Sequence, residues 1–182
     1  SHRDIAVLLQ LEDKELLNEM FKVAGEIKKS IYGNRVVLFA PLYIGNKCTN
    51  SCTYCGFKVS NHDTLRQTLT LDEVRAEVEA LTDEGHKRLI MVYGTHPDYS
   101  PEYIASTVKE AYAFKKKNGE IRRVNINACP LSVEDYKPIK EAGIGTYQIF
   151  QESYHEETYK KMHVGGEKSN FKWRLFGLSR AM

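Results

Sequence analysis

Apolar residues at helical spacing occupy the stretch from residue 13 to residue 31 and predict one long amphipathic helix. Asp13 is placed to cap the start of this helix, and Gly33 with Asn34 follows its end. The next apolar run, residues 36–44, is short and β-branched at its start, which favours a buried strand. This change of pattern divides the chain into an N-terminal helical extension, residues 1–35, and a second domain, residues 36–182.

The second domain repeats a unit in which a helical pattern precedes a short apolar strand. Thr70 and Glu73 form a capping box at the start of one predicted helix, Ser100 is placed to cap another, and Ser132 a third. Pro138 lies inside the third helix and should kink it or delay its start. The predicted strands cover residues 88–93, 123–127 and 146–150, and two further helical patterns cover residues 156–162 and 171–182.

Strands that alternate with helices pair in parallel through right-handed crossovers, so the predicted fold class is α/β. Two architectures satisfy this rule: an open doubly wound sheet, and parallel βα units that form about half of a (β/α)8 barrel. No Gly-x-Gly-x-x-Gly turn follows the first strand; the loop there carries cysteines instead. In both architectures ligands bind at the carboxyl ends of the strands.

Polar or otherwise unusual residues follow each predicted strand in turn: Cys48–Cys55, Gly94 with Thr95, Asn127, and Gln151 with Glu152. Because the carboxyl ends of parallel strands meet at one edge of the sheet, we expect these residues to share one site. That these residues share one edge of the sheet is the strongest inference that the pattern of elements supports.

The composition is that of a folded domain. Hydrophobic residues make up 42% of the 182 residues and charged residues 27%, which excludes a disordered chain. The 26 Lys and Arg against 24 Asp and Glu leave a net charge of +2, which gives no reason to expect nucleic-acid binding. No apolar run approaches the ~18 residues of a membrane span, and no basic-then-apolar leader is present. We therefore expect a cytoplasmic protein that does not enter a membrane.

Three of the four cysteines, Cys48, Cys52 and Cys55, follow the spacing Cys-x3-Cys-x2-Cys. In a reducing compartment such a cluster binds metal more often than it forms disulfides. Structural zinc sites take four ligands, usually from two separated pairs, whereas three thiolates fit a [4Fe–4S] cluster in which one iron has no protein ligand. Tyr54 and Phe57 would shield such a cluster with aromatic rings. The spacing favours the iron–sulfur centre over zinc.

The motif Cys48-x3-Cys52-x-Tyr54-Cys55 resembles the signature of radical S-adenosylmethionine (SAM) enzymes. The resemblance implies that SAM binds the open iron through its amine and carboxylate. It also implies that an electron from the cluster splits SAM into methionine and a 5′-deoxyadenosyl radical, which takes hydrogen from the substrate. In many members a Gly-Gly-Glu-like turn after the second strand receives the SAM amine; here Gly94 and Thr95 stand at that place, with a hydroxyl where an acid is usual.

Longer stretches are similar to the tyrosine lyases of this superfamily, and among them to the HydG family of [FeFe]-hydrogenase maturases, with the ThiH family as a near relative. They span nearly all of the chain: residues 31–35, 40–44, 56–57, 85–88, 122–127, 142–148 and 150–155. The resemblance implies a (β/α)8 barrel, of which the four predicted strands form about half. It also supports Gln151 and Glu152 as contacts of the ribose or methionyl end of SAM, and Asn127 as a further cofactor contact.

The resemblance implies that L-tyrosine is cleaved to p-cresol and dehydroglycine, and that dehydroglycine becomes the carbon monoxide and cyanide of the hydrogenase cofactor. An electron donor and other hydrogenase maturation proteins are the implied partners. The alternatives are a ThiH-type lyase for thiamine synthesis, a non-catalytic iron–sulfur domain and a zinc-stabilised binding module.

Two expectations concern residues outside the predicted site. Cys129 as a fourth ligand would close the iron that SAM needs, so we interpret it as an inert buried thiol. Residues 178–182 form the middle of an amphipathic pattern, so we expect the chain to be part of a longer protein and a poor tyrosine lyase by itself.

Overall fold

The computed structural model describes residues 1–116 and 119–182, which group into two compact units, Ser1–Val37 and Leu38–Met182. The first unit contains helices α1 (His2–Leu9) and α2 (Lys14–Tyr32). The apolar spacing predicts α2 but misses α1, because eight residues are too few to show a helical repeat.

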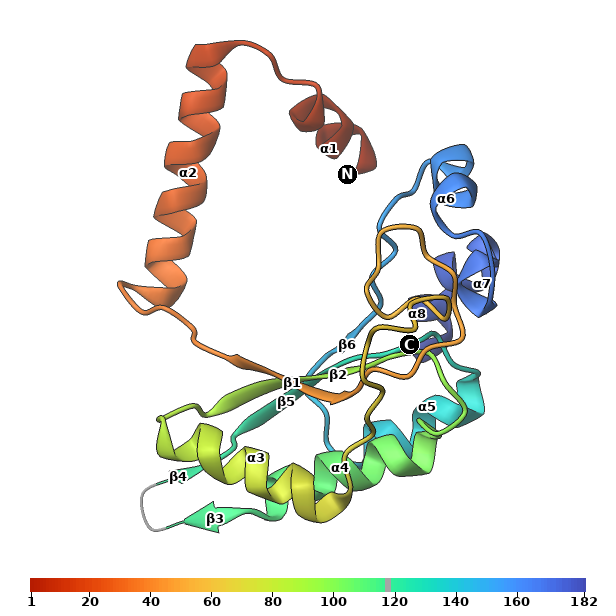
Figure 1. Cartoon of the computed structure of the whole chain (residues 1–182). Helices are drawn as coiled ribbons and strands as arrows, with labels where there is room; N and C mark the ends of the chain where they lie inside the picture. The colour runs from red at the N-terminus through yellow and green to blue at the C-terminus, as the bar shows by residue number, and fades with distance from the viewer. Residues whose placement is uncertain (117–118) are drawn as a thin grey trace. The chain divides into compact units, whose positions relative to one another are not determined.

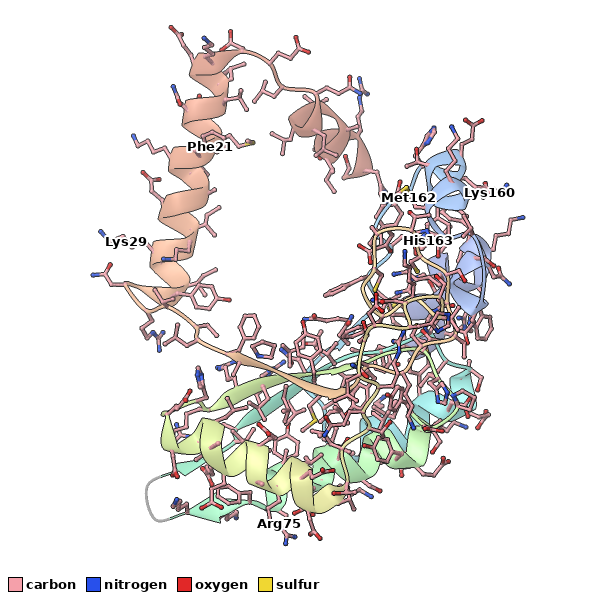
Figure 2. The ribbon with its side chains drawn as sticks, in the orientation of Figure 1. Phe21, Lys29, Arg75, Lys160, Met162 and His163 are labelled. Carbon is pink, nitrogen blue, oxygen red and sulfur yellow. The ribbon has the colours of Figure 1, made fainter. Side chains whose placement is uncertain are left out.

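The predicted caps of α2 are present, whereas its predicted apolar stripe is not buried. The Asp13 carboxylate accepts hydrogen bonds from the backbone N–H groups of Glu15 and Leu16, and Gly33 ends the helix at a φ of 60°. No residue of α1 or α2 is buried within the described part of the chain. Phe21 of α2, for example, which Figure 2 labels, is 62% exposed.

The second unit is built on one parallel sheet of four strands in the order β1-β2-β5-β6 (Figure 1). Their bounds are Ala40–Gly45 for β1, Arg88–Tyr93 for β2, Arg123–Asn127 for β5 and Tyr147–Gln148 for β6. Strand order follows chain order without reversal, as in a barrel, whereas a doubly wound sheet reverses direction at its switch point.

Three helices cover the same face of this sheet: α3 (Leu71–Asp83), α4 (Pro101–Ala113) and α5 (Val133–Glu141) (Figure 1). A doubly wound sheet carries helices on both faces, so this arrangement excludes that alternative. The predicted α/β fold of parallel βα units, about half of a (β/α)8 barrel, is confirmed. Within residues 1–116 and 119–182, every helix is too short or too polar to span a bilayer.

The hydrophobic core lies between the sheet and these helices. In β5, Val124 and Ile126 are fully buried against the helices, while the alternate side chains of Asn125 and Asn127 face the other way. The same core takes Leu89 and Met91 from β2 and, from the helices, Val74, Val78, Ile104, Val108 and Ile139. The helical periodicity predicts these inward positions because each helix has one apolar side.

Several element boundaries differ from the sequence predictions. The first strand begins at Ala40 rather than residue 36, and the fourth contains only Tyr147 and Gln148 of the predicted residues 146–150. α4 ends at Ala113, and a small antiparallel pair follows, β3 (Lys115–Lys116) and β4 (Gly119–Glu120). An apolar run indicates which residues can form a strand. The strand itself extends only over the residues that pair with an adjacent strand.

The chain after β6 forms short helices near the carboxyl ends of the strands: α6 (Glu156–Met162), a 3-10 turn η1 (Glu167–Ser169), α7 (Phe171–Leu175) and α8 (Gly177–Ala181) (Figure 1). The predicted helix over residues 171–182 is therefore divided at Phe176. α5 is continuous through Pro138, which costs it one backbone hydrogen bond without breaking it.

Candidate functional site

The loop between β1 and α3, residues 46–70, carries the three clustered cysteines and contains neither helix nor strand. We call residues 47–61 the cysteine loop. Its backbone is attached to the rest of the unit by hydrogen bonds that leave the loop. The N–H of Thr49 donates to the carbonyl of Thr95 at 2.8 Å, and the N–H of Lys47 donates to Tyr99 Oη at 3.0 Å. The loop is thus tied to the turn after β2.

Gly94 allows this close approach. A Cβ added at Gly94 would lie 2.0 Å from the carbonyl oxygen of Lys47, next to Cys48. Only glycine leaves room for the backbone of the cysteine loop at this point. The structure therefore gives Gly94 a positional role beside the cofactor contact that the sequence predicts for it.

The segment around α6 covers the cysteine loop from the other side. Ser51 N–H donates to the Gly165 carbonyl at 3.0 Å, and Thr53 N–H donates to the Met162 carbonyl at 2.9 Å. Between them Cys52 forms an isolated β-bridge with His163, and Figure 2 shows His163 beside the loop. Residues more than 100 positions apart in the sequence therefore hold the middle of the loop in place.

His163 connects this cover to the aromatic residue that precedes Cys55. Its Nε2 lies 2.7 Å from Tyr54 Oη, and its Nδ1 lies 2.8 Å from the carbonyl oxygen of Tyr159. Because a carbonyl only accepts, Nδ1 carries the proton, so Nε2 of the neutral ring accepts from the Tyr54 hydroxyl. Burial raises the pKa of Tyr54, so its hydroxyl keeps the proton that it donates. The Tyr54 ring is thereby fixed in orientation.

The loop and the strand ends enclose a cavity of about 190 Å³. All but one of the predicted site residues line it: Cys48, Cys52, Tyr54, Cys55, Phe57, Gly94, Thr95, Asn127 and Glu152. Sequence reasoning missed three other lining residues with functional side chains: Asn50, Lys168 and Arg174. It also placed Cys129 outside the site, whereas the Cys129 side chain lines this cavity. A larger cavity of about 540 Å³ beside α5, β6 and α8 holds none of the predicted site residues.

Gln151 is the exception among the predicted contacts. Its side chain is 7% exposed and does not line the cavity, and its Nε2 reaches the carbonyl of Ser153 at 3.5 Å. The chain turns between Gln151 and Glu152, and only one of their side chains faces the cavity. Glu152 does so, with a left-handed φ of 68° that is the only positive φ at a non-glycine residue of the described chain.

The three thiols share the cavity without being drawn together. Among the described residues, no three His, Cys, Asp or Glu side chains are grouped closely enough to hold a metal ion. A [4Fe–4S] cluster binds each thiolate to a different iron, so it does not need the close grouping that a single ion needs. Three unpaired thiols around one cavity therefore fit the cluster better than they fit zinc, which takes four ligands.

Two cations and one carboxylate line the same cavity as the thiols. Lys168 Nζ contacts Glu152 Oε1 at 2.9 Å, and the lysine side chain is only 12% exposed. Arg174 is 6% exposed and donates from Nε to the Phe150 carbonyl at 2.9 Å. This is its only hydrogen bond within residues 1–116 and 119–182, so its terminal nitrogens are open to a ligand. A buried guanidinium without an acidic partner favours an anionic ligand beside it.

Burial also keeps two of the thiols protonated. It raises the pKa of Cys52, and the nearby charge of Lys168 opposes this rise. Burial raises the pKa of Cys129 to about 12. Cys129 belongs to the turn after β5, where its carbonyl accepts a hydrogen bond from Tyr147 Oη at 2.6 Å. Cys129 is half-buried rather than fully buried, and its inertness stays a prediction.

A parallel half-barrel that presents three clustered thiols at its carboxyl edge is the arrangement of the radical SAM superfamily, and the family model for that superfamily matches residues 42–180. The chain belongs to this superfamily. Membership implies a [4Fe–4S] cluster and SAM as cofactors.

Within the superfamily, the chain is similar to two crystal structures of HydG. One, described as a maturase of the [FeFe]-hydrogenase, has a TM-score of 0.90 and 52% identity over 97% of this chain and 39% of that chain. The FeFe-hydrogenase maturase HydG from Carboxydothermus hydrogenoformans has a TM-score of 0.84 and 41% identity over 94% of this chain and 39% of its own.

A curated relative is the 2-iminoacetate synthase of Salmonella typhimurium (strain LT2), which is 34% identical over 96% of this chain and 45% of its own length. The chain thus spans less than half the length of these relatives.

The raised pKa of Cys129 predicts slow alkylation. A thiol with a pKa near 12 holds about three orders of magnitude less thiolate at pH ~8.5 than an ordinary cysteine does, and only the thiolate reacts. Site-resolved mass spectrometry after brief iodoacetamide treatment should find Cys129 the last cysteine to be modified, with its rate rising as the pH is raised. In urea the difference should disappear. Equal modification of Cys129 and Cys55 in the folded chain would contradict this environment.

Proposed function

We propose that this chain provides the cluster-binding and SAM-binding half of a radical SAM lyase that acts on tyrosine. One observation carries the proposal: three thiols, a buried arginine and a Lys168–Glu152 ion pair surround one cavity at the carboxyl edge of a parallel half-barrel. The cavity thus offers thiolate ligands for iron together with charged groups for a zwitterionic amino-acid cofactor.

Cys48, Cys52 and Cys55 are the proposed ligands of the cluster. When bound, the cluster supplies one-electron chemistry to SAM, which is the reaction that defines the superfamily. The chain itself contributes a donor to one ligand, because the N–H of Phe57 points to Cys55 Sγ at 3.4 Å. Hydrogen bonds to a cysteine sulfur stabilise its thiolate form and tune the metal centre. The rings of Tyr54 and Phe57 line the cavity beside Cys55.

Arg174 and Lys168 are the proposed partners of the carboxylate of SAM. Arg174 is buried, and the described chain offers its terminal nitrogens no acceptor. A bidentate pair with a carboxylate would satisfy both of these nitrogens and is the geometry that a guanidinium favours. Lys168 is held between Glu152 and the face of the Tyr54 ring, 5.7 Å from its centroid. Its second role is to hold the Glu152 carboxylate in place.

Glu152 is the proposed acceptor for the ribose hydroxyls or the amine of SAM. Its Oε1 is engaged by Lys168, which leaves the second oxygen free to accept from a ligand. Asn127 donates to the Gln148 carbonyl at 3.1 Å, so its side chain is oriented by β6 and its amide oxygen is available at the end of β5. Thr95 offers a hydroxyl, which binds an ammonium less strongly than a carboxylate does.

The proposed substrate of the complete protein is L-tyrosine, cleaved to p-cresol and dehydroglycine, with carbon monoxide and cyanide as the later products for hydrogenase maturation. The support is the 52% identity to a HydG structure, against 34% to a 2-iminoacetate synthase. The latter keeps a ThiH-type output as the second candidate. An electron donor and other maturation proteins are the proposed partners, and four free cysteines favour the reducing cytoplasm as the compartment.

The cluster assignment predicts distinct results for the four cysteines. After anaerobic reconstitution the chain should bind iron and sulfide, and the electron paramagnetic resonance spectrum of the reduced cluster should change when SAM is added. Cys48→Ala, Cys52→Ala and Cys55→Ala should each lose the cluster, because no spare thiol lies within the loop. Cys129→Ala is the matched control and should keep it. Loss of iron in Cys129→Ala alone would overturn the ligand set, and zinc in place of iron and sulfide would overturn the function.

The role of Glu152 predicts weaker SAM binding in Glu152→Ala. A hydrogen bond to a charged group contributes about 1.5–3 kcal/mol, so the SAM dissociation constant should rise by about one to two factors of ten while the cluster spectrum is retained. Glu157→Ala, in the exposed first turn of α6, is the control and should bind SAM normally. Unchanged SAM affinity in Glu152→Ala would remove this residue from the site.

The half-barrel predicts that the 182-residue chain cleaves SAM without tyrosine turnover. Helices cover one face of the described sheet, and β1 and β6 form its edges, so a substrate in the barrel interior would lie in water. With SAM, a strong reductant and tyrosine, we expect 5′-deoxyadenosine and little or no p-cresol. Joined to the C-terminal part of the Carboxydothermus HydG, the chain should produce p-cresol from tyrosine. SAM cleavage by the joined protein without p-cresol would show that tyrosine is the wrong substrate.

A further inference from the structure

We propose that Arg66 is a positioning residue that orders the cysteine loop before the cluster binds. The inference rests on the proposed function, because an ordered loop matters for function only if a cluster binds there. The contacts of Arg66 themselves involve no cofactor. Arg66 lies outside the cavity and outside every motif that the sequence analysis singles out.

The guanidinium of Arg66 binds both ends of the cysteine loop at once. Nη1 donates to the carbonyls of Asn46 at 2.7 Å and Phe57 at 2.9 Å. Nη2 donates to the carbonyls of Lys58 at 2.8 Å and Asn61 at 3.0 Å. Asn46 lies two residues before the first cysteine of the motif, and Phe57 lies two residues after the last. One side chain therefore closes the loop across the whole three-cysteine motif.

Arg66 is itself held in place at the end of β1. Asn46 donates from Nδ2 to the Leu65 carbonyl at 2.7 Å and accepts at Oδ1 from the N–H of Gln67 at 2.8 Å. The backbone N–H of Asn46 donates to the Gln67 carbonyl at 3.2 Å, and Gly45 forms a bridge with Thr68. These contacts involve the residues immediately before and after Arg66. They fix the Arg66 backbone beside the end of β1.

The loop needs this side chain because it has little regular structure of its own. Carbonyls of a helix or strand are satisfied by the backbone, whereas those of an irregular loop need other donors. The four carbonyls take all four N–H groups of the two terminal nitrogens, which lie in one plane. A lysine ammonium has only three N–H donors, all on one nitrogen atom. It cannot reach the four carbonyls that the two separate nitrogens of the guanidinium reach. The site therefore requires arginine, and not merely a cation.

Arg66 supplies the hydrogen bonds that join the second half of the loop to the end of β1. The first half and the middle are tied to Thr95, Met162 and Gly165 by backbone hydrogen bonds. After Cys55, residues 57–61 have bonds within the loop, such as Val59 N–H to the Asn50 carbonyl at 2.8 Å. Asn61 also bonds to Asp63 and Thr64 just after the loop, and the Phe57 ring contacts Tyr43 of β1. The four hydrogen bonds from Arg66 are added to these contacts. Arg66 thereby connects this half to β1 and sets the spacing between the ends of the motif.

The test compares Arg66→Lys and Arg66→Gln with Arg35→Lys in the 182-residue chain without cofactor. Arg35 is a matched control because it donates to a single carbonyl, that of Tyr32, at 3.0 Å. Amide hydrogen exchange should speed up about tenfold or more at Val59 and Asn61 in both Arg66 variants, the change that follows loss of one charge-assisted hydrogen bond. Exchange in β2 should be unchanged, and Arg35→Lys should match the wild type throughout.

Reconstitution supplies the second measurement. Only the ordered loop is competent to bind, so the apparent affinity for the cluster should fall by the same factor as the loop's exchange protection. Iron and sulfide per chain at limiting iron should therefore fall in Arg66→Lys and stay normal in Arg35→Lys.

Three outcomes overturn the inference: normal loop exchange in Arg66→Lys, faster exchange in β2 to the same extent as in the loop, or full iron content despite a mobile loop. A wild-type chain that binds no cluster would overturn the proposed function instead. The exchange measurement would still decide whether Arg66 orders the loop.

Discussion

The parallel register of the four-stranded sheet is the constraint on which the site depends. Because β1, β2, β5 and β6 run in the same direction, the loops that follow them emerge at one edge. The core between the sheet and α3, α4 and α5 fixes this register, since a slip by one residue would move Val124 and Ile126 out of the core. Residues from four separate parts of the chain meet around one cavity for this reason.

The cysteine loop receives its order from its surroundings. It pairs with residues 162–165 on one side and with the turn after β2 on another, and Arg66 closes its two ends. Glycine at position 94 is needed because the loop backbone passes too close for any side chain. A loop held in this way loses less conformational entropy when ligands bind to it, so the thiols are prepared for a cluster without being drawn into contact.

The charges of the cavity complement the chemistry of the thiols. Lys168 lowers the pKa of Cys52 against the effect of burial, and it also forms the ion pair with Glu152. Arg174 adds a buried positive charge that lacks an acidic partner among the described residues. A site that combines thiols with cations suits a negatively charged cluster and a cofactor that carries a carboxylate.

The sequence by itself determined the features that depend on near neighbours. The caps at Thr70, Ser100 and Ser132 and the three-cysteine motif are local patterns, and strand ends in a parallel fold share one edge. Tertiary structure alone decided which of Gln151 and Glu152 faces the cavity, and it brought His163, Lys168 and Arg174 to a loop more than 100 residues earlier. Those contacts depend on how the chain after β6 folds back over the sheet edge. No periodicity or spacing records that path, because its hydrogen bonds join residues that are distant in the sequence.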